Sequence, residues 1–271
     1  MRTLAIVLEY DGTDYHGWQV QPGKLTLQGS LEGALTDVFG NPVRVHSSGR
    51  TDAGTHALGQ VVSLYTTSAL SSHELSNALN SKLSPSVRIL SVNEVPLSFN
   101  ARTSANRKEY RYIIFNGKTV PPFLERYVYH VVRPLPPPDA WLPFLKLFEG
   151  THDFTSFSAS GDSLMQRTRT LYSFQVERHP GGFLLFRLVG DGFLYKMVRI
   201  LVGEVTSAVL KKKSLAELEE LLEHPNRGTR RLCLPSRGLF LYHVSYVSCD
   251  PFAGLTPVEG VFPLPLWRKG N

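Results

Sequence analysis

Cysteine is scarce in this sequence: Cys233 and Cys249 are the only two among 271 residues, and they form no ligand-spaced pair. They cannot build a disulfide framework or a thiolate zinc site. Apolar runs long enough to span a bilayer are missing, and so is a charged-then-apolar signal region at the N-terminus. We therefore expect a protein of the reducing cytoplasm without a membrane segment.

Motifs for common cofactors are missing as well. The sequence has no dinucleotide fingerprint and no P-loop, and its histidines show no metal-ligand spacing such as H-x-x-x-H. We expect neither a cofactor nor a metal. His56 follows Asp52 by four residues, which would suit the acid and base of a hydrolase, but no serine or cysteine elbow accompanies them. A hydrolase is therefore disfavoured.

The overall composition is that of an ordinary globular protein, with 42% hydrophobic and 19% charged residues. A chain of 271 residues is long enough for one large or two modest domains with their own cores. The formal net charge is +6 and the sequence pI about 9.3. This basic excess suits a polyanionic partner, although it also occurs in proteins without one.

Hydrophobic spacing in the first hundred residues predicts strands that alternate with helices. Apolar residues at three-and-four spacing predict an amphipathic helix over residues 27–39. A second helix is expected over residues 71–82, capped by Ser71 or Ser72 with Glu74 near its third position. Strands are predicted at residues 3–9, 42–47, 60–66 and 87–95. The order β-α-β-β-α-β is that of the ferredoxin-like unit.

The remaining sequence repeats this theme less regularly. It predicts strands at residues 109–115, 171–177, 183–189 and 239–247, and helices at residues 140–148, 194–210 and 215–222. We expect an α+β fold of two ferredoxin-like, RNA-recognition-like halves with largely antiparallel sheets, either separate or fused into one central sheet. The halves are residues 1–99 and 100–248, and their junction lies near residues 99–107.

Residues 249–271 are rich in proline and apolar side chains. The segment is too apolar for a free tail, and its prolines exclude a helix. We expect an extended strap that packs on its own chain or on a partner.

A polar loop between two predicted strands carries the first candidate for chemistry. In residues 48–57, S-G-R-T-D-A-G-T-H-A, Gly49 and Gly54 flank Arg50 and Asp52. The glycines allow a tight backbone that presents both side chains to one pocket. From spacing alone, a solvated turn with an Asx hydrogen bond is the commoner explanation.

A second candidate is Arg199, which lies in the almost entirely apolar helix predicted around residues 194–210. Such a helix leaves hardly any polar face, so the guanidinium is expected to be at least partly buried. A buried cation needs a carboxylate partner, because desolvation without one costs several kcal/mol or more. An internal ion pair without a catalytic duty explains the pattern equally well.

A third candidate is the basic run over residues 100–112, in which tyrosines are interleaved with cations. Alternation along a strand places Tyr110 and Tyr112 on one face and Arg111 on the other. Cations can hold phosphates while an aromatic ring stacks on an unstacked base. For either tyrosine alone, a core position is the better interpretation. The candidate RNA contacts here are Arg102, Arg107, Lys108 and Arg111.

At these stretches the sequence resembles the tRNA pseudouridine synthase A family, and the resemblance extends over nearly the whole chain. The G-R-T-D-A-G segment is a specific signature by itself. The matching motifs are Y-D-G-T-D-Y-H-G-W-Q at 10–19, T-L-Q-G-S-L-E-G-A-L at 26–35, G-R-T-D-A-G-T-H-A at 49–57, N-A-R at 100–102, E-Y-R-Y at 109–112, D-F-T-S-F at 153–157, F-L-Y-K-M-V-R at 193–199 and G-L-F-L at 238–241.

The resemblance implies an isomerase that converts uridine to pseudouridine in the tRNA anticodon stem-loop, at tRNA positions 38, 39 and 40. Asp52 corresponds to the essential aspartate, Tyr110 to the base-stacking tyrosine and Arg199 to the basic residue paired with the aspartate. The family also implies a homodimer that shares a basic tRNA groove. Departures are Thr55 in place of a common valine, Leu234 in place of a common alanine, and residues 249–271 beyond the last expected strand.

Chemistry on a base requires that the nucleotide leave its duplex. Arg50 is the candidate that occupies the vacated position or holds the adjacent phosphate. Further candidates for RNA contact are Lys24, Arg167, Arg169 and Lys211, Lys212 and Lys213. The alternative function is a catalytically silent RNA-binding module, which explains the charge and the aromatic residues but not the Asp52 loop together with Arg199.

Overall fold

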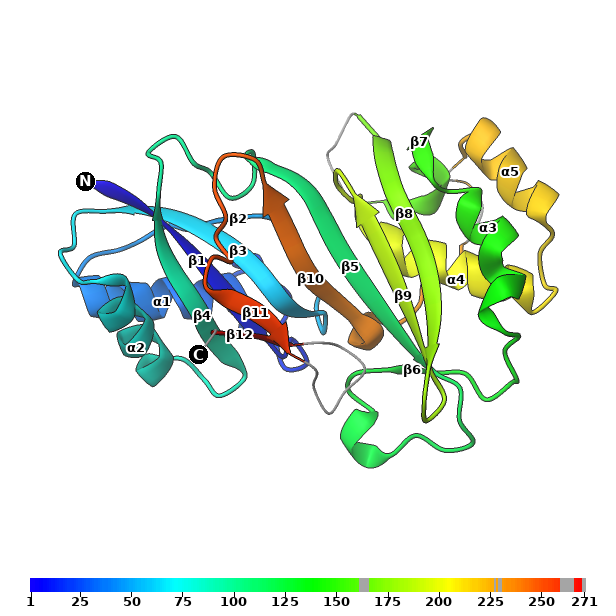
Figure 1. Cartoon of the computed structure of the whole chain (residues 1–271), viewed down its shortest axis with the longest axis horizontal. Helices are drawn as coiled ribbons and strands as arrows, with labels where there is room; N and C mark the ends of the chain where they lie inside the picture. Colours follow the sequence, from blue (N-terminus) through cyan, green and yellow to red (C-terminus); the bar gives the residue numbers. More distant parts are fainter. Residues whose placement is uncertain (161–165, 227, 229–230, 259–265, 270–271) are drawn as a thin grey trace. The chain divides into compact units, whose positions relative to one another are not determined.

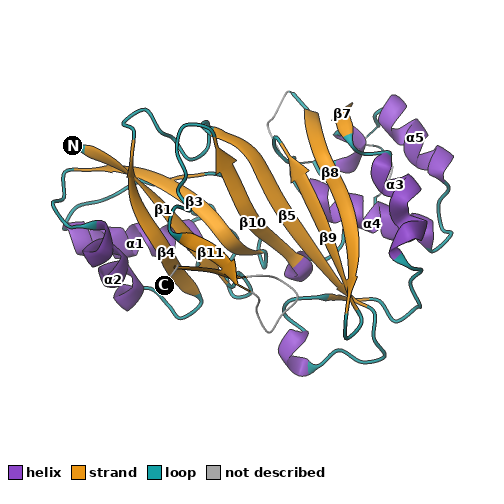
Figure 2. Cartoon of the chain, in the orientation of Figure 1, coloured by secondary structure: helices purple, strands orange, loops and turns teal. Residues whose placement is uncertain are grey.

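The computed structural model describes the chain except residues 161–165, 227, 229–230, 259–265 and 270–271. The chain forms two compact units, one of residues 1–106 together with 240–271, and one of residues 107–239. Both combine helices with largely antiparallel strands, which confirms the α+β class (Figures 1 and 2). Fusion of their sheets concerns the placement of the units and stays a prediction.

The first unit is built on a sheet with β1 at its centre. β1 pairs antiparallel with β3 and β4, while β2 pairs antiparallel and β10 parallel with β3. The order β1-α1-β2-β3-α2-β4 confirms the ferredoxin-like order predicted for the first half. The elements are β1 (Arg2–Tyr10), α1 (Leu27–Phe39), β2 (His46–Ser47), β3 (His56–Thr66), α2 (Ser72–Lys82), β4 (Val87–Val95) and β10 (Leu239–Tyr246).

Local signals explain both helices of this unit. The Thr26 side chain accepts from Gly29 N at the start of α1, and Gly40 ends the helix in the left-handed region at φ 73°. Ser71 and Glu74 form a reciprocal capping box at the start of α2, as the sequence predicts. The two helices pack against each other, and α2 packs on β4.

The second unit contains an antiparallel sheet in the order β5-β9-β8-β7 and the most apolar helix, α4. β6 pairs parallel with β5. The elements are β5 (Ala105–Phe115), β6 (Tyr129–His130), α3 (Leu142–Lys146), β7 (Gly150–Asp153), β8 (Thr168–His179), β9 (Phe183–Gly190), α4 (Met197–Val209) and α5 (Leu215–Glu223), with 3₁₀ helices η1 (Pro122–Leu124), η2 (Pro138–Trp141), η3 (Thr155–Phe157) and η4 (Ser236–Gly238).

Two predicted elements are shorter than expected. The strand predicted at residues 42–47 is reduced to β2, because the Val45 N–H donates to Glu32 Oε1 at 3.1 Å instead of to a neighbouring strand. The helix predicted at residues 140–148 is α3 preceded by η2, because Pro143 near its start cannot donate a backbone hydrogen bond.

The unit boundaries differ from the predicted halves 1–99 and 100–248. Residues 240–246 belong with the first unit, because β10 pairs with β3 through Phe240 and His56 and through Leu241 and Ala57. Residues 100–106 also belong to the first unit, where Ala101 N donates to Ser63 Oγ at 3.0 Å.

The described part of residues 249–271 is a two-stranded ladder and not a single extended strap. β11 (Leu255–Val258) pairs antiparallel with β12 (Leu266–Lys269), and β12 lies close to β3 and β4 (Figure 1). Phe252 is 4% exposed, and Pro251 O accepts hydrogen bonds from Ser91 and Asn93. The segment therefore packs on its own chain; residues 259–265 and 270–271 lie outside the described part.

Candidate active site

The Asp52 loop is held by a second loop, residues 10–18, far away in the sequence. Trp18 N donates to Thr51 O at 3.0 Å, and Gly54 N donates to Tyr15 O at 3.3 Å. The Tyr10 hydroxyl lies 2.8 Å from Thr51 Oγ1. Burial raises the pKa of Tyr10 above its ordinary value, partly offset by the hydrogen bond with Thr51. Hydrogen bonds therefore join the Asp52 loop and the loop of residues 10–18 to each other.

Two glycines make this approach possible. A Cβ on Gly12 would lie 2.0 Å from Thr55 O, which is well inside van der Waals contact. Gly17 has φ +86°, and its Cβ would lie 2.8 Å from Thr51 O. Any side chain at these positions would push the two loops apart.

The start of the Asp52 loop is anchored to β3. Ser48 Oγ donates to Gln60 Oε1 at 2.6 Å, and Gln60 Nε2 donates to Gly49 O at 2.9 Å. Ser48 and Gln60 are both fully buried. These two bonds fasten the loop before Arg50, and the bond from Trp18 N to Thr51 O fastens it after Arg50.

Within this frame the Asp52 side chain is half-buried and Arg50 is exposed. Thr55 N donates to Asp52 O at 3.1 Å, which closes a turn, and Gly54 takes the left-handed conformation at φ 72°. The structure thus presents a carboxylate from a hydrogen-bonded turn without enclosing it completely. This arrangement suits a group that must reach a substrate.

His56 belongs to the core of the first unit. Its side chain is 2% exposed, its Nδ1 lies 3.1 Å from Asp11 Oδ1, and its ring stacks on Phe240 at 4.8 Å. These contacts give His56 a structural place in the first unit.

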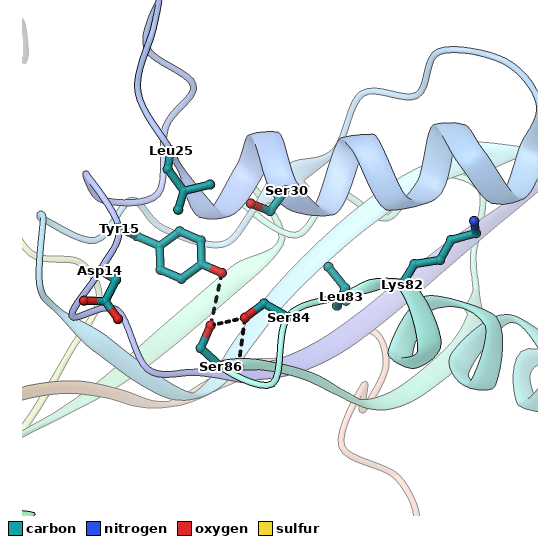
Figure 3. A pocket seen from close by; sticks show the side chains of 8 residues that line it. All are labelled: Asp14, Tyr15, Leu25, Ser30, Lys82, Leu83, Ser84 and Ser86. Atoms are coloured by element: carbon teal, nitrogen blue, oxygen red, sulfur yellow. Dashed lines mark hydrogen bonds between the residues drawn. The ribbon is translucent and has the colours of Figure 1, made fainter.

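A pocket of about 290 Å³ lies beside the residue 10–18 loop, between α1 and the end of α2 (Figure 3). The Tyr15 hydroxyl points into it and lies 3.1 Å from Ser86 Oγ, which in turn lies 2.9 Å from Ser84 Oγ. Its lining comprises Asp14, Tyr15, Leu25, Ser30, Lys82, Leu83, Ser84 and Ser86. The predicted site residues are not among them.

Thr55 carries a buried hydroxyl directly after the Asp52 turn. The residue is 1% exposed, and in the described part of the chain Oγ1 has no hydrogen-bond partner. Leaving a hydroxyl in this state costs about 1–3 kcal/mol. Thr55→Val keeps the shape, so we expect it to raise the free energy of unfolding by about 1 kcal/mol and the midpoint of thermal unfolding by about 2–4 °C.

The matched control for this measurement is Thr51→Val, which removes the partner of Tyr10 and is expected to lower the midpoint. If Thr55→Val leaves the midpoint unchanged or lowers it, the Thr55 hydroxyl has a partner and the prediction is wrong.

In the second unit, β5 places Tyr110 and Tyr112 in the interior, as the alternation predicts. Tyr110 is 7% exposed, and its ring lies edge-on to Phe193 at 5.0 Å. Tyr112 is fully buried and donates its hydroxyl to Pro235 O at 2.8 Å. Burial raises the pKa of Tyr112 well above its ordinary value.

Arg111 is committed to an ion-pair cluster that the sequence analysis did not foresee. Its Nε donates to Glu109 Oε1 at 2.8 Å, and Arg187 donates to Glu109 Oε2 at 2.9 Å. Burial alone would raise the pKa of Glu109, but the hydrogen bond from Arg187 and the charge of Arg111 outweigh it and hold the pKa below its usual range. A direct RNA contact by Arg111 stays a prediction. The ion pair of Arg111 with Glu109 disfavours it.

Arg199 lies in the first turn of α4 and is half-buried, as expected from its apolar helix. Its Nε donates to Leu234 O at 2.7 Å. The fully buried charge of α4 is Glu204, at 0% exposure, which forms an ion pair with Lys213. Glu204 was not predicted as a buried charge, although an acidic residue among apolar helix neighbours indicates one.

The remaining basic residues that are candidates for RNA contact are exposed or half-buried. Arg107 lies over the ring of Tyr172, with its guanidinium carbon 4.7 Å from the ring centroid. Lys213 is occupied by Glu204, so its proposed RNA contact is disfavoured. Exposed candidates are Lys24, Arg50, Arg102, Arg107, Lys211 and Lys212, and half-buried ones are Lys108, Arg167 and Arg169.

The three expected catalytic residues belong to different units. Asp52 lies in the first unit, and Tyr110 and Arg199 lie in the second, on β5 and α4.

Among the described helices, none is long and apolar enough to cross a membrane. One group of side chains in the described chain has metal-ligand spacing, Glu220, Glu223 and His224, and all three are exposed.

The comparisons with known proteins agree with the motifs. A family model described as tRNA pseudouridine synthase matches residues 6–103 and 144–247. The chain is 43% identical to tRNA pseudouridine synthase A of Anoxybacillus flavithermus over 248 residues, covering 91% of this chain and 99% of that protein. It is 41% identical to tRNA pseudouridine synthase A of Brevibacillus brevis, covering 91% of this chain and 100% of that protein. This chain therefore belongs to the tRNA pseudouridine synthase A family.

Proposed function

We propose that this chain isomerises uridine to pseudouridine in the anticodon stem-loop of tRNA, at tRNA positions 38, 39 and 40, with Asp52 as the catalytic carboxylate. Family membership supports the reaction. The observation that carries the role of Asp52 is its half-buried place on a turn that hydrogen bonds fasten to a second loop, residues 10–18.

The reaction breaks the bond between N1 and C1′, turns the uracil over and joins C5 to C1′. The C5 proton leaves and N1 gains one, so no atoms are lost and no redox or phosphate chemistry is involved. A carboxylate can attack C1′, stabilise an oxocarbenium-like centre, or remove a sugar proton to give a glycal intermediate. All three routes remain open for Asp52.

Tyr110 and Arg199 are proposed to assist Asp52. A tyrosine ring can hold the detached uracil by stacking, and its place beside Phe193 gives it a defined orientation. Arg199 is proposed to orient the Asp52 carboxylate by a charge-assisted hydrogen bond. Arg50, exposed two residues before Asp52, is proposed to stabilise the extruded state of the nucleotide.

Release of tritium from tRNA that carries [5-³H]uridine tests the function directly, because C5 loses its hydrogen only when the new bond forms. We expect release from a tRNA with uridine at positions 38 to 40. The same tRNA with cytidine at those positions is the control. If the chain binds tRNA but releases no tritium, the silent RNA-binding module is the correct interpretation.

Binding to tRNA is expected to weaken steeply with salt, because cations that contact phosphates release counterions. If about six cations make such contacts, the affinity falls by roughly 10³-fold between 50 and 200 mM salt. Arg102→Gln is expected to reduce the slope of log K against log salt by about one unit. The measurement is a filter-binding titration over a salt series.

Arg44→Gln is the matched control, because Arg44 is 82% exposed and is not among the candidate contacts. A flat salt series for the unmodified chain would contradict a basic binding surface.

The homodimer and the cytoplasmic location implied by the sequence stay predictions.

A further inference from the structure

Residues 232–235 run along α4 and are held to it at successive backbone groups. Leu232 N donates to Glu204 Oε1 at 2.7 Å. Leu234 N donates to Arg199 O at 3.3 Å, and Arg199 Nε donates back to Leu234 O at 2.7 Å. The carbonyl that holds the Arg199 side chain therefore lies only two positions along the chain from the amide that Glu204 holds.

The segment is pressed closely onto the helix between these two points. A Cβ on Gly203 would lie 2.1 Å from Leu232 O, so only glycine admits the segment here. At its far end, Pro235 O accepts the Tyr112 hydroxyl at 2.8 Å. Glu204 and Tyr112 thus hold the two ends of a short backbone segment, residues 232–235, that carries Leu234 O.

The residue that holds Leu232 N, Glu204, is 0% exposed, which is unusual for a carboxylate. An ionised carboxylate at such depth is stable only when it is paired and hydrogen-bonded. Lys213 supplies the opposite charge, and Leu232 N supplies a hydrogen bond to the other oxygen. Both carboxylate oxygens therefore have partners.

The turn after α4 delivers Lys213 to this position. Lys211 takes the left-handed conformation at φ 59°, and Lys212 N donates to Ser207 O at 3.0 Å. This turns the chain back along the helix, after which Ser214 begins α5 with a capping box. Three segments of the second unit therefore meet at Glu204: α4, the turn at 210–213 and residues 232–235.

We propose that Glu204 is a positioning residue for the Arg199 guanidinium: by holding Leu232 N, it fixes the Leu234 carbonyl that sets the direction of Arg199 Nε. The inference rests on the proposed catalytic role of Arg199. It assigns a function to a buried charge that the isomerisation itself does not use. A guanidinium whose Nε is tied in this way has its remaining N–H groups directed before any substrate arrives.

Two variants of Glu204 separate positioning from charge. Glu204→Gln keeps an oxygen that can accept from Leu232 N but loses the negative charge. Glu204→Leu removes the acceptor as well. Leu218→Ala is the control, since Leu218 is a fully buried residue of α5 whose loss destabilises the second unit without removing a hydrogen bond from residues 232–235.

The first readout is independent of activity. The NMR signal of Arg199 Nε–H, assigned by its loss in Arg199→Lys, reports solvent exchange of the proton that Leu234 O accepts. We expect exchange at least about tenfold faster in Glu204→Leu, and near the unmodified rate in Glu204→Gln and Leu218→Ala, because only the first loses the acceptor for Leu232 N.

The second readout is kinetic, at a temperature where every variant is folded. We expect Glu204→Leu to lower kcat by roughly tenfold to a hundredfold, as for a group displaced by about 1 Å, with KM for tRNA within about twofold. Glu204→Gln is expected to retain most of kcat, and Leu218→Ala to lose stability only.

Unchanged Arg199 exchange in Glu204→Leu would overturn the proposal, and so would a loss of kcat in Leu218→Ala as large as that in Glu204→Leu. An unmodified chain that releases no tritium would overturn the proposed function instead, and the exchange measurement would still decide whether Glu204 holds Arg199.

Discussion

Asp52→Asn is expected to abolish pseudouridine formation while the protein remains folded and binds tRNA. The amide keeps the size and most hydrogen bonds of the side chain, but it cannot act as nucleophile, as base or as a stabilising negative charge. By comparison with the loss of essential groups in other enzymes, kcat should fall by at least roughly 10⁴-fold. Tritium release and tRNA binding, measured on the same preparation, separate catalysis from recognition.

The fold is expected to survive because the Asp52 turn is held by other groups. Its hydrogen bonds run from Trp18 N to Thr51 O and from Gly54 N to Tyr15 O, and both use backbone atoms that the substitution leaves in place. Asp14→Asn is the matched control, because it makes the same chemical change at an exposed position of the neighbouring loop. Substantial activity of Asp52→Asn, once contaminating unmodified enzyme is excluded, would remove Asp52 from its role.

Arg199→Met is expected to lower activity and stability together. The change removes the donor to Leu234 O, a buried residue at 1% exposure, at an expected cost of about 1–3 kcal/mol in the free energy of unfolding. In the role proposed for Arg199, its loss is expected to lower kcat by roughly 10²–10³-fold, the range found when one hydrogen-bond donor is removed from an active site. Arg199→Lys should retain more activity, since it keeps the charge but loses the planar fork.

Arg178→Met supplies the matched control for stability. Arg178 also donates to backbone carbonyls of the second unit, those of Leu135 and Pro136, both at 3.1 Å. We expect it to lower stability by a similar amount and to leave kcat unchanged. If Arg178→Met lost as much kcat as Arg199→Met, the effect would be structural and general.

A double-mutant cycle tests whether Arg199 acts on Asp52. Arg199→Met combined with Asp52→Leu should recover the part of the lost stability that an unpaired Asp52 carboxylate costs, but not the part due to Leu234 O, and should restore no activity; the expected coupling energy in denaturant unfolding is about 0.5–3 kcal/mol. A coupling energy indistinguishable from zero would mean that Arg199 pairs with a different group. The proposed site would then have to be redrawn around that group.

Some elements could be predicted within a residue because their signals are local. The capping box of Ser71 and Glu74 starts α2, and the glycine at position 40 ends α1, so both helices lie where the sequence places them. The β4 strand matches its predicted range for the same reason, since alternation along the chain is itself the signal.

Elements that depend on distant partners were predicted less well. β10 was assigned to the second half, yet its pairing with β3 places it in the first unit. The predicted strand at residues 42–47 is short because a side chain of α1, Glu32, takes the Val45 N–H. Neither of these two contacts can be inferred from the local spacing of apolar residues.

The sequence by itself determined the α+β class, the family and the candidate residues Asp52, Tyr110 and Arg199, because motifs and hydrophobic periods are properties of neighbouring residues. Only the tertiary structure decided what holds those residues. Gly12 and Gly17 let one loop clamp the Asp52 turn, and Glu204 pairs with Lys213 to secure the backbone beside Arg199. These contacts join segments far apart along the chain, and burial gives them their strength, because a polar group removed from water must find its partner inside the fold.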